Sequence, residues 1–170
     1  MGALRTLGIG LSMLAAQVGL AETPTSDEAK VETIASMYAG YRNDFAGVPE
    51  VDAAELAALQ ERGDLVLVDV REPKERAVSI IPGAIPKEAF SAEVAEGKTV
   101  VAYCTIGYRS GEWAEKQRAA GIDAKNFKGS VLAWSHAGGG FVTPEGEATQ
   151  KVHVYGKLWD LLRHDYESVY

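Results

Sequence analysis

The hydrophobic pattern of the chain is clearest in two short apolar runs. Residues 65–70 and 99–103 are almost entirely apolar, and polar or glycine-containing segments bound both runs. Such runs are typical of strands that are covered on both faces, as in a parallel sheet. A further short strand is expected at residues 124–127.

A helical period precedes the first strand. Val31, Ile34, Ala35 and Tyr38 recur at positions i, i+3, i+4 and i+7, which places them on one helix face. The polar segment 23–27 before them has the composition of a linker. The sequence therefore predicts a linker and one helix ahead of the domain core.

The next helix has explicit start and stop signals. Asp52 is a good N-cap, and Glu55 three residues later completes the pattern of a capping box. Leu56 and Leu59 supply a buried stripe, and Gly63 suits the helix end. We expect the helix to lie between Asp52 and Gly63.

More helices are expected beyond the first strand. A turn-rich segment, 81–86, precedes a short helix at about 87–95, and another helix follows Ser110 and runs to Gly121. An amphipathic helix near the C-terminus is predicted from the spacing of Tyr155, Leu158, Trp159, Leu162 and Tyr166. The alternation predicts an α/β fold with a central, mostly parallel sheet flanked by helices. Extra N- and C-terminal helices are expected to pack on it.

The first 21 residues have the pattern of a secretory signal. Arg5 precedes the apolar stretch 7–18, and Gly19 and Ala21 are the small residues that a cleavage site needs. Cleavage would leave Glu22 as the new N-terminus. The apolar stretch is short for a membrane span, which takes about 20 residues. We therefore expect an exported protein, periplasmic or secreted, with no membrane span after cleavage; an uncleaved anchor is the alternative.

Composition narrows the class of protein. The 170 residues are 46% hydrophobic and 24% charged, which suits one soluble domain. The net charge is -7 without a basic run, which argues against nucleic-acid binding. We expect segment 22–48 to hold the linker and first helix, 49–137 the domain core, and 138–170 a loop and the C-terminal helix.

Cys104 is the only cysteine, and its position makes it the candidate nucleophile. It directly follows the second apolar run, and ligands of open α/β sheets bind beyond the carboxyl ends of strands. Backbone N–H groups at the start of the next helix and the nearby Arg109 favour a thiolate. Gly107 permits a tight loop, and Ser110 can cap the helix. The predicted substrate-binding residues are Thr105, Ile106, Gly107, Tyr108, Arg109 and Ser110.

These segments resemble the rhodanese, or thiosulfate sulfurtransferase, family. The resemblance rests on segments between residues 51 and 134, about half of the chain, namely 69–72, 81–86, 103–110, 119–122 and 128–134. It implies a single rhodanese-like domain and a two-step reaction. Cys104 would take a sulfane sulfur from a donor such as thiosulfate or a persulfide, and pass it to cyanide or a thiol.

The resemblance also implies roles for the loop. Amides of residues 105–109 would hold the anionic persulfide, and the Arg109 guanidinium would hold the oxyanion end of the donor. Thr105 stands where thiosulfate-specific members often have a cation. No cofactor is implied. A metal site is not expected either, because one cysteine and three scattered histidines do not match a ligand pattern.

Three other functions remain open at this point. A phosphatase or arsenate reductase of related fold needs seven residues from Cys to Arg, whereas Cys104 to Arg109 spans six. A Cys/His hydrolase would have to recruit His136, His153 or His164. A rhodanese-like module that binds sulfur compounds or a partner without turnover is the third alternative.

Overall fold

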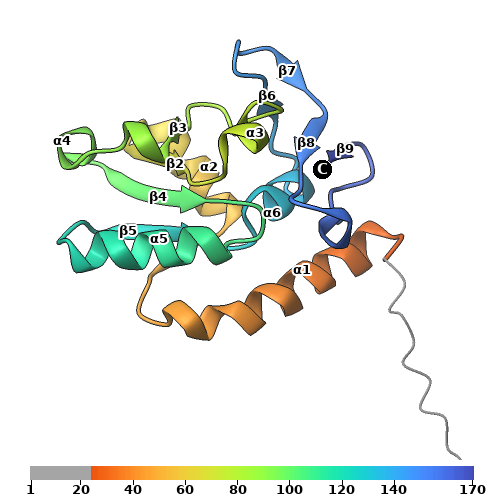
Figure 1. The fold of residues 1–170 in the computed structure, drawn as a ribbon, viewed down its shortest axis with the longest axis horizontal. Coiled ribbons are helices and arrows are strands. Elements are labelled where there is room, and N and C mark those ends of the chain that lie inside the picture. Colours follow the sequence, from red (N-terminus) through yellow and green to blue (C-terminus); the bar gives the residue numbers. More distant parts are fainter. Residues whose placement is uncertain (1–23) are drawn as a thin grey trace, which may run out of the picture.

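A five-stranded parallel sheet forms the centre of the domain (Figure 1). The computed structural model describes residues 24–170, so the predicted signal segment 1–21 lies outside the described residues. The strand order is β1-β5-β4-β2-β3. The strands are β1 (Glu50–Val51), β2 (Leu65–Asp69), β3 (Ile85–Pro86), β4 (Thr99–Tyr103) and β5 (Ala124–Phe127).

The three predicted strands are confirmed. Strands β2 and β4 pair in parallel over five residues each, from Leu65 opposite Thr99 to Asp69 opposite Tyr103. Their central residues are fully buried because helices cover both faces of the sheet. The parallel arrangement brings the carboxyl ends of the strands to one edge.

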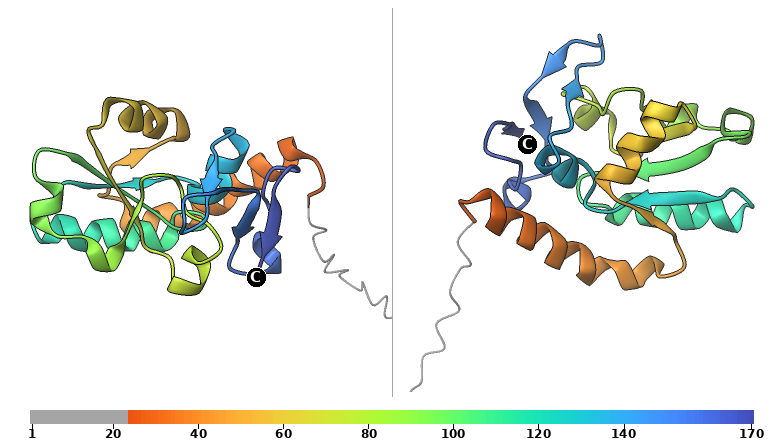
Figure 2. Two further views of the ribbon diagram at one scale, coloured as in Figure 1. Left: turned by 90° about the horizontal axis from the view of Figure 1, so that it is seen from above. Right: turned by 180° about the vertical axis from the view of Figure 1, so that it is seen from behind.

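Helices α2 (Ala53–Arg62) and α5 (Tyr108–Ala119) lie on opposite faces of the sheet (Figure 2). The predicted capping signals of α2 are confirmed. The Asp52 side chain accepts from the Glu55 N–H at 2.9 Å, the Glu55 carboxylate accepts from the Asp52 N–H, and Gly63 ends the helix in a left-handed conformation.

The predicted N-terminal helix is α1 (Asp27–Tyr41), capped by Ser26. A 3-10 turn, η1 (Arg42–Phe45), follows it. Ile34 and Tyr38 of the predicted face are buried, whereas Val31 is 46% exposed. Helix α1 packs against α6 (Ser130–His136), and η1 packs against α5. The ring of Tyr41, the last residue of α1, lies 5.3 Å from that of Tyr108 at the start of α5.

Three short helices complete the domain core. Helix α3 (Pro73–Arg76) follows β2, and helix α6 (Ser130–His136) follows β5. The single helix expected at 87–95 is instead divided into the 3-10 turn η2 (Lys87–Ala89) and helix α4 (Ala92–Ala95). The break occurs because Phe90 is extended and Ser91 caps a new helix.

The prediction of a C-terminal helix is wrong. Segment 138–170 forms strands β6 (Phe141–Val142), β7 (Ala148–Thr149), β8 (Lys151–His153) and β9 (Glu167–Val169), with only the 3-10 turn η3 (Lys157–Trp159) at the predicted position. Strand β8 pairs with β9 in parallel. Left-handed Tyr155 and extended Gly156 interrupt any helix, and Leu158 is 85% exposed while Leu161 and Leu162 are buried. Ladder pairing and burial outweigh a helical spacing over so short a segment.

Within residues 24–170, no helix has the length and apolar character that crossing a membrane requires.

Candidate active site

Cys104 lies between β4 and α5, at the carboxyl edge of the sheet. The residue is 1% exposed. Its N–H donates to Ser130 Oγ at 3.0 Å, and its carbonyl accepts from the Val131 N–H at 3.3 Å. The start of the loop is therefore fixed by hydrogen bonds to the first residues of α6.

Two groups hydrogen-bond the Cys104 sulfur. The Gly107 N–H lies 3.2 Å from Sγ, and the Ser110 hydroxyl lies 3.6 Å from it. Gly107 has a φ of 109°, and a Cβ there would come within 2.7 Å of a Tyr38 ring carbon, so the tight loop requires glycine. The expected cap is wrong: Gly107 caps α5, and Ser110 lies inside its first turn, where its hydroxyl faces the sulfur.

The surroundings of Cys104 favour its thiolate. Burial raises the pKa of the thiol, but the Arg109 charge and the hydrogen bonds from Ser110 and Gly107 outweigh burial, so the pKa lies below its ordinary value. A lowered pKa increases the thiolate fraction, and the thiolate is the nucleophilic form of cysteine. Cys104 is therefore chemically competent as a nucleophile.

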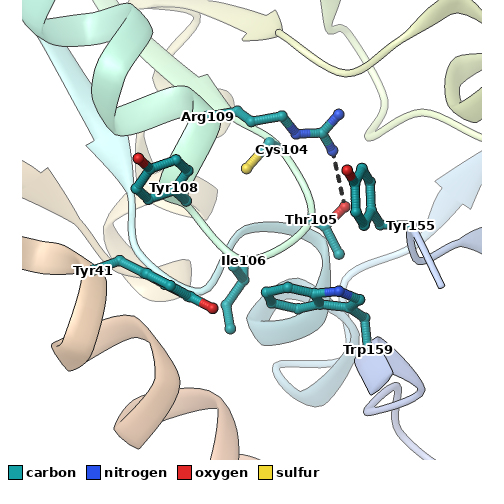
Figure 3. A pocket seen from close by; sticks show the side chains of 8 residues that line it. All are labelled: Tyr41, Cys104, Thr105, Ile106, Tyr108, Arg109, Tyr155 and Trp159. Carbon is teal, nitrogen blue, oxygen red and sulfur yellow. Dashed lines mark hydrogen bonds between the residues drawn. The ribbon is translucent and has the colours of Figure 1, made fainter. Parts of the chain in front are cut away.

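Arg109 is bound by a carboxylate that the sequence did not single out. Its Nη1 and Nη2 atoms donate to the two Glu75 oxygens at 2.7 and 2.8 Å, and Nη2 also donates to Thr105 Oγ1 at 3.2 Å (Figure 3). Glu75 lies on α3 and is fully buried. Burial raises the pKa of Glu75, but its bonds from Arg109 and the Glu72 N–H bring it below the ordinary value. Much of the guanidinium fork is thus occupied within the protein.

A chain of buried hydrogen bonds extends from Ser110 to helix α1. The Ser110 hydroxyl has one proton, which it donates either to Asn126 Oδ1 at 2.7 Å or to Cys104 Sγ at 3.6 Å. The Asn126 amide donates to the Gly107 carbonyl at 2.8 Å and to Tyr38 Oη at 3.0 Å, and the Tyr38 hydroxyl donates to Glu50 at 2.6 Å. These contacts fix the C-terminal part of the loop at Gly107 and Ser110, and only the fold brings their residues together.

Asp69 and Arg71 brace the end of β2. Arg71 Nη2 donates to Asp69 Oδ2 at 2.7 Å and to the Ser79 carbonyl at 2.6 Å, and both charged groups are buried. The Tyr103 hydroxyl also donates to Asp69 at 2.5 Å. Neither charged residue lines the pocket that Cys104 faces.

That pocket has a volume of about 280 Å³ (Figure 3). Of the predicted site residues, Gly107 and Ser110 do not line it but contact the sulfur. The lining residues are Tyr41, Cys104, Thr105, Ile106, Tyr108, Arg109, Tyr155 and Trp159. Tyr41, Tyr155 and Trp159 come from segments that the sequence reasoning assigned only to packing. Their aromatic character was the one available signal.

The histidines lie elsewhere. None of the three lines the pocket within the described part of the chain. His136 Nε2 lies 2.8 Å from the Leu161 carbonyl, and His164 Nδ1 lies 2.6 Å from Asp27. His153 is buried and its Nδ1 accepts from the Tyr155 N–H. A Cys/His pair is therefore not assembled at this pocket.

A family model and several known proteins match part of this chain. A family model for the rhodanese-like domain matches residues 52–137. An uncharacterized protein from Synechocystis sp. is 37% identical over 89 residues, which cover 49% of this chain and 50% of that protein. A protein named sulfurtransferase from Allochromatium vinosum is 33% identical over 106 residues, which cover 58% of this chain and 99% of that protein.

Solved structures share the fold of this chain. The thiosulfate sulfurtransferase of Pseudomonas aeruginosa superposes with a TM-score of 0.55 at 21% sequence identity. The superposition covers 69% of this chain and 24% of that one. At this identity, the likeness establishes the α/β fold.

Proposed function

Because the chain belongs to the rhodanese family, we propose that it is an enzyme that transfers sulfane sulfur through a persulfide on Cys104. The family model matches half of the chain, and the relatives of the chain include a protein named sulfurtransferase. The observation that carries the proposal is the thiol at the pocket floor, hydrogen-bonded by Gly107 and Ser110 beside the Arg109 charge. A binding module without turnover would not need an activated thiol.

In the first step, the Cys104 thiolate attacks the outer sulfur of a donor such as thiosulfate or an organic persulfide. The sulfur–sulfur bond of the donor breaks, and its electron pair leaves with sulfite or with the organic thiolate. The product is a Cys104 persulfide. The Gly107 N–H and the Ser110 hydroxyl, which now hydrogen-bond Sγ, remain available to stabilise the negative charge.

In the second step, cyanide or a thiol attacks the outer sulfur of the persulfide. The bond to Cys104 Sγ breaks, and Sγ takes the electron pair and becomes a thiolate again. Arg109 stabilises that thiolate, since its charge already lowers the pKa of Cys104. Donor and acceptor use the site in turn, which gives ping-pong kinetics.

Intact-mass measurement tests this proposal. Purified protein incubated with thiosulfate is expected to gain one sulfur atom and to lose it on addition of cyanide, with formation of thiocyanate. Cys104→Ser is expected to gain none. Sulfur uptake without release to any acceptor would support a binding module, and phosphate release from an aryl phosphate without thiocyanate would support a phosphatase.

We also propose that the protein is exported, on the basis of residues 1–21 alone. Expression of the full chain in a secreting bacterial host, followed by fractionation, tests this. Mature protein that begins at Glu22 and lies outside the cytoplasm is expected. Full-length protein in the cytoplasm would contradict the proposal.

A further inference from the structure

Four aromatic side chains form a continuous wall around the pocket. We call Tyr41, Tyr108, Tyr155 and Trp159 the aromatic wall; Figure 3 shows them grouped around Ile106 and the thiol. The Tyr41 ring centroid lies 5.3 Å from that of Tyr108 and 6.3 Å from that of Trp159. The rings of Trp159 and Tyr155 are 6.3 Å apart. This is far more apolar surface than an inorganic anion contacts.

Most of the aromatic wall comes from outside the segment that the family model matches. Tyr41 ends α1, whereas Tyr155 and Trp159 lie between β8 and β9. The wall is therefore a feature added to the catalytic domain by its two flanking segments. Those segments bring rings to the thiol that the core alone does not supply.

Tyr155 is held in an unfavourable backbone conformation at this place. Its φ is 70°, which side-chain-bearing residues rarely adopt. Its N–H donates to His153 Nδ1 at 3.1 Å, and β8–β9 pairing fixes the chain just before it. The result is a ring whose centroid lies 5.2 Å from the Arg109 guanidinium carbon. This contact places the Tyr155 ring of the aromatic wall directly against the Arg109 guanidinium.

The charge of the pocket does not suit a dianion. Arg109 is the only cation among the pocket-lining residues of the described chain. Both oxygens of buried Glu75 are bound to it, at 2.7 and 2.8 Å. The carboxylate occupies both terminal nitrogens of the guanidinium, and its negative charge opposes the approach of a dianion such as thiosulfate.

We propose that the aromatic wall selects organic sulfur compounds, in which an apolar or aromatic body carries the sulfur, over inorganic thiosulfate. The inference rests on the proposed sulfur-transfer function and specifies its substrate class. A volume of about 280 Å³ is close to the lower end of ligand sites, roughly 300–1,000 Å³. The organic body would contact the rings while its sulfur reaches Cys104.

The chemistry of the step is balanced without a further reactant. For an organic persulfide, the Cys104 thiolate and R–S–SH give Cys104–S–SH and the thiolate R–S⁻. The bond between the two donor sulfurs breaks, and its electron pair leaves on R–S⁻. The same step run in reverse loads a thiol acceptor. A thiosulfonate donor, R–SO₂–S⁻, reacts likewise and releases the sulfinate R–SO₂⁻.

Two thiosulfonates that differ only in R provide the test. Toluenethiosulfonate and methanethiosulfonate carry the same reacting group and a single negative charge. For the wild-type protein, kcat/KM with cyanide as acceptor is measured for each donor. The kcat/KM for toluenethiosulfonate divided by that for methanethiosulfonate is the donor ratio. Relative to the wild type, this ratio is expected to fall about tenfold in Trp159→Leu and in Tyr155→Gly, since each removes one ring contact. Intrinsic donor reactivity cancels in this comparison.

Leu158→Ala is the matched control. Leu158 is adjacent to Trp159 and 85% exposed but does not line the pocket, so its ratio should equal that of the wild type. Glycine suits the left-handed φ of position 155, so Tyr155→Gly removes the ring without straining the backbone. Circular dichroism confirms the fold of each variant.

A second measurement needs no variant. Toluenesulfonate is expected to inhibit the wild-type protein about tenfold more strongly than methanesulfonate. Equal inhibition, or a donor ratio that stays constant in both wall variants, overturns the inference alone. If neither donor nor thiosulfate adds sulfur to Cys104, the proposed function fails and the inference fails with it.

Discussion

Replacement of Glu75 by glutamine isolates the contribution of the ion pair beside Cys104. Glutamine has nearly the same shape as glutamate, but it presents one donor and one acceptor where the carboxylate presents two acceptors. The carboxylate accepts from Arg109 Nη1 and Nη2 and from the Glu72 N–H at 2.9 Å. At least one bond from Arg109 is therefore lost in Glu75→Gln, where two donors would face each other.

The expected loss of stability follows from burial. Glu75 is fully buried, and a hydrogen bond to a charged group contributes about 1.5–3 kcal/mol. We expect the free energy of unfolding of Glu75→Gln to be lower by about 1.5–3 kcal/mol at neutral pH. Urea denaturation followed by circular dichroism measures it.

The pH dependence of this difference has a definite sign. The pKa of Glu75 in the folded protein lies below its ordinary value of 4.5. The charged carboxylate therefore adds stability that is fully present above pH 4.5, and that stability is lost as the pH falls through the lower, folded-state pKa. The glutamine variant has no such titration, so the two proteins should become closer in stability in acid.

Glu88→Gln is the matched control. Glu88 pairs with Arg76 at 2.9 Å, but its side chain is 54% exposed, and solvent screens exposed pairs so that they contribute little to stability. A Glu75→Gln variant no less stable than Glu88→Gln at neutral pH would refute the reasoning. So would a difference from wild type that persists unchanged in acid.

Two further substitutions test the loop and its brace. Ser110→Ala should raise the pKa of Cys104, because the hydroxyl stabilises the thiolate; the pH profile of iodoacetamide alkylation measures it, and an unmoved midpoint would contradict it. Asp69→Asn should lower the free energy of unfolding by about 3–5 kcal/mol, because it leaves Arg71 buried without its partner. A loss below about 1 kcal/mol in urea denaturation would show that the pair does not brace the strand.

The part of the fold that the sequence predicts is the part with local signals. Strands β2 and β4 are continuous apolar runs, and α2 carries its own cap and stop at Asp52 and Gly63. Helix α6 has no such start, because Gly129 and Ser130 precede and open it in left-handed conformations. The helical spacing of the C-terminal segment gave a wrong prediction, because the strand pairing of β8 with β9 joins residues that are not close in the chain.

The candidate site divides in the same way. Cys104 and its loop are contiguous, so position after a strand was enough to find them. Glu75, Asn126 and Tyr155 meet the loop only through the order of the sheet and the fold of the C-terminal segment. Glu75 had one usable signal, since it is a charged residue soon after the carboxyl end of a strand. Asn126 had none, because it reads as part of a strand.

Backbone strain is concentrated at this site. Within the described residues, Ser130 and Tyr155 are the two non-glycine positions with positive φ. Such conformations cost about 1–3 kcal/mol each, a large share of a typical domain stability of roughly 5–15 kcal/mol. Glycine at 130 would relieve the backbone but would remove the hydroxyl that accepts from the Cys104 N–H and donates to the Phe127 carbonyl, both at 3.0 Å. Position 130 therefore keeps a side chain against local preference because that side chain fixes the reactive cysteine.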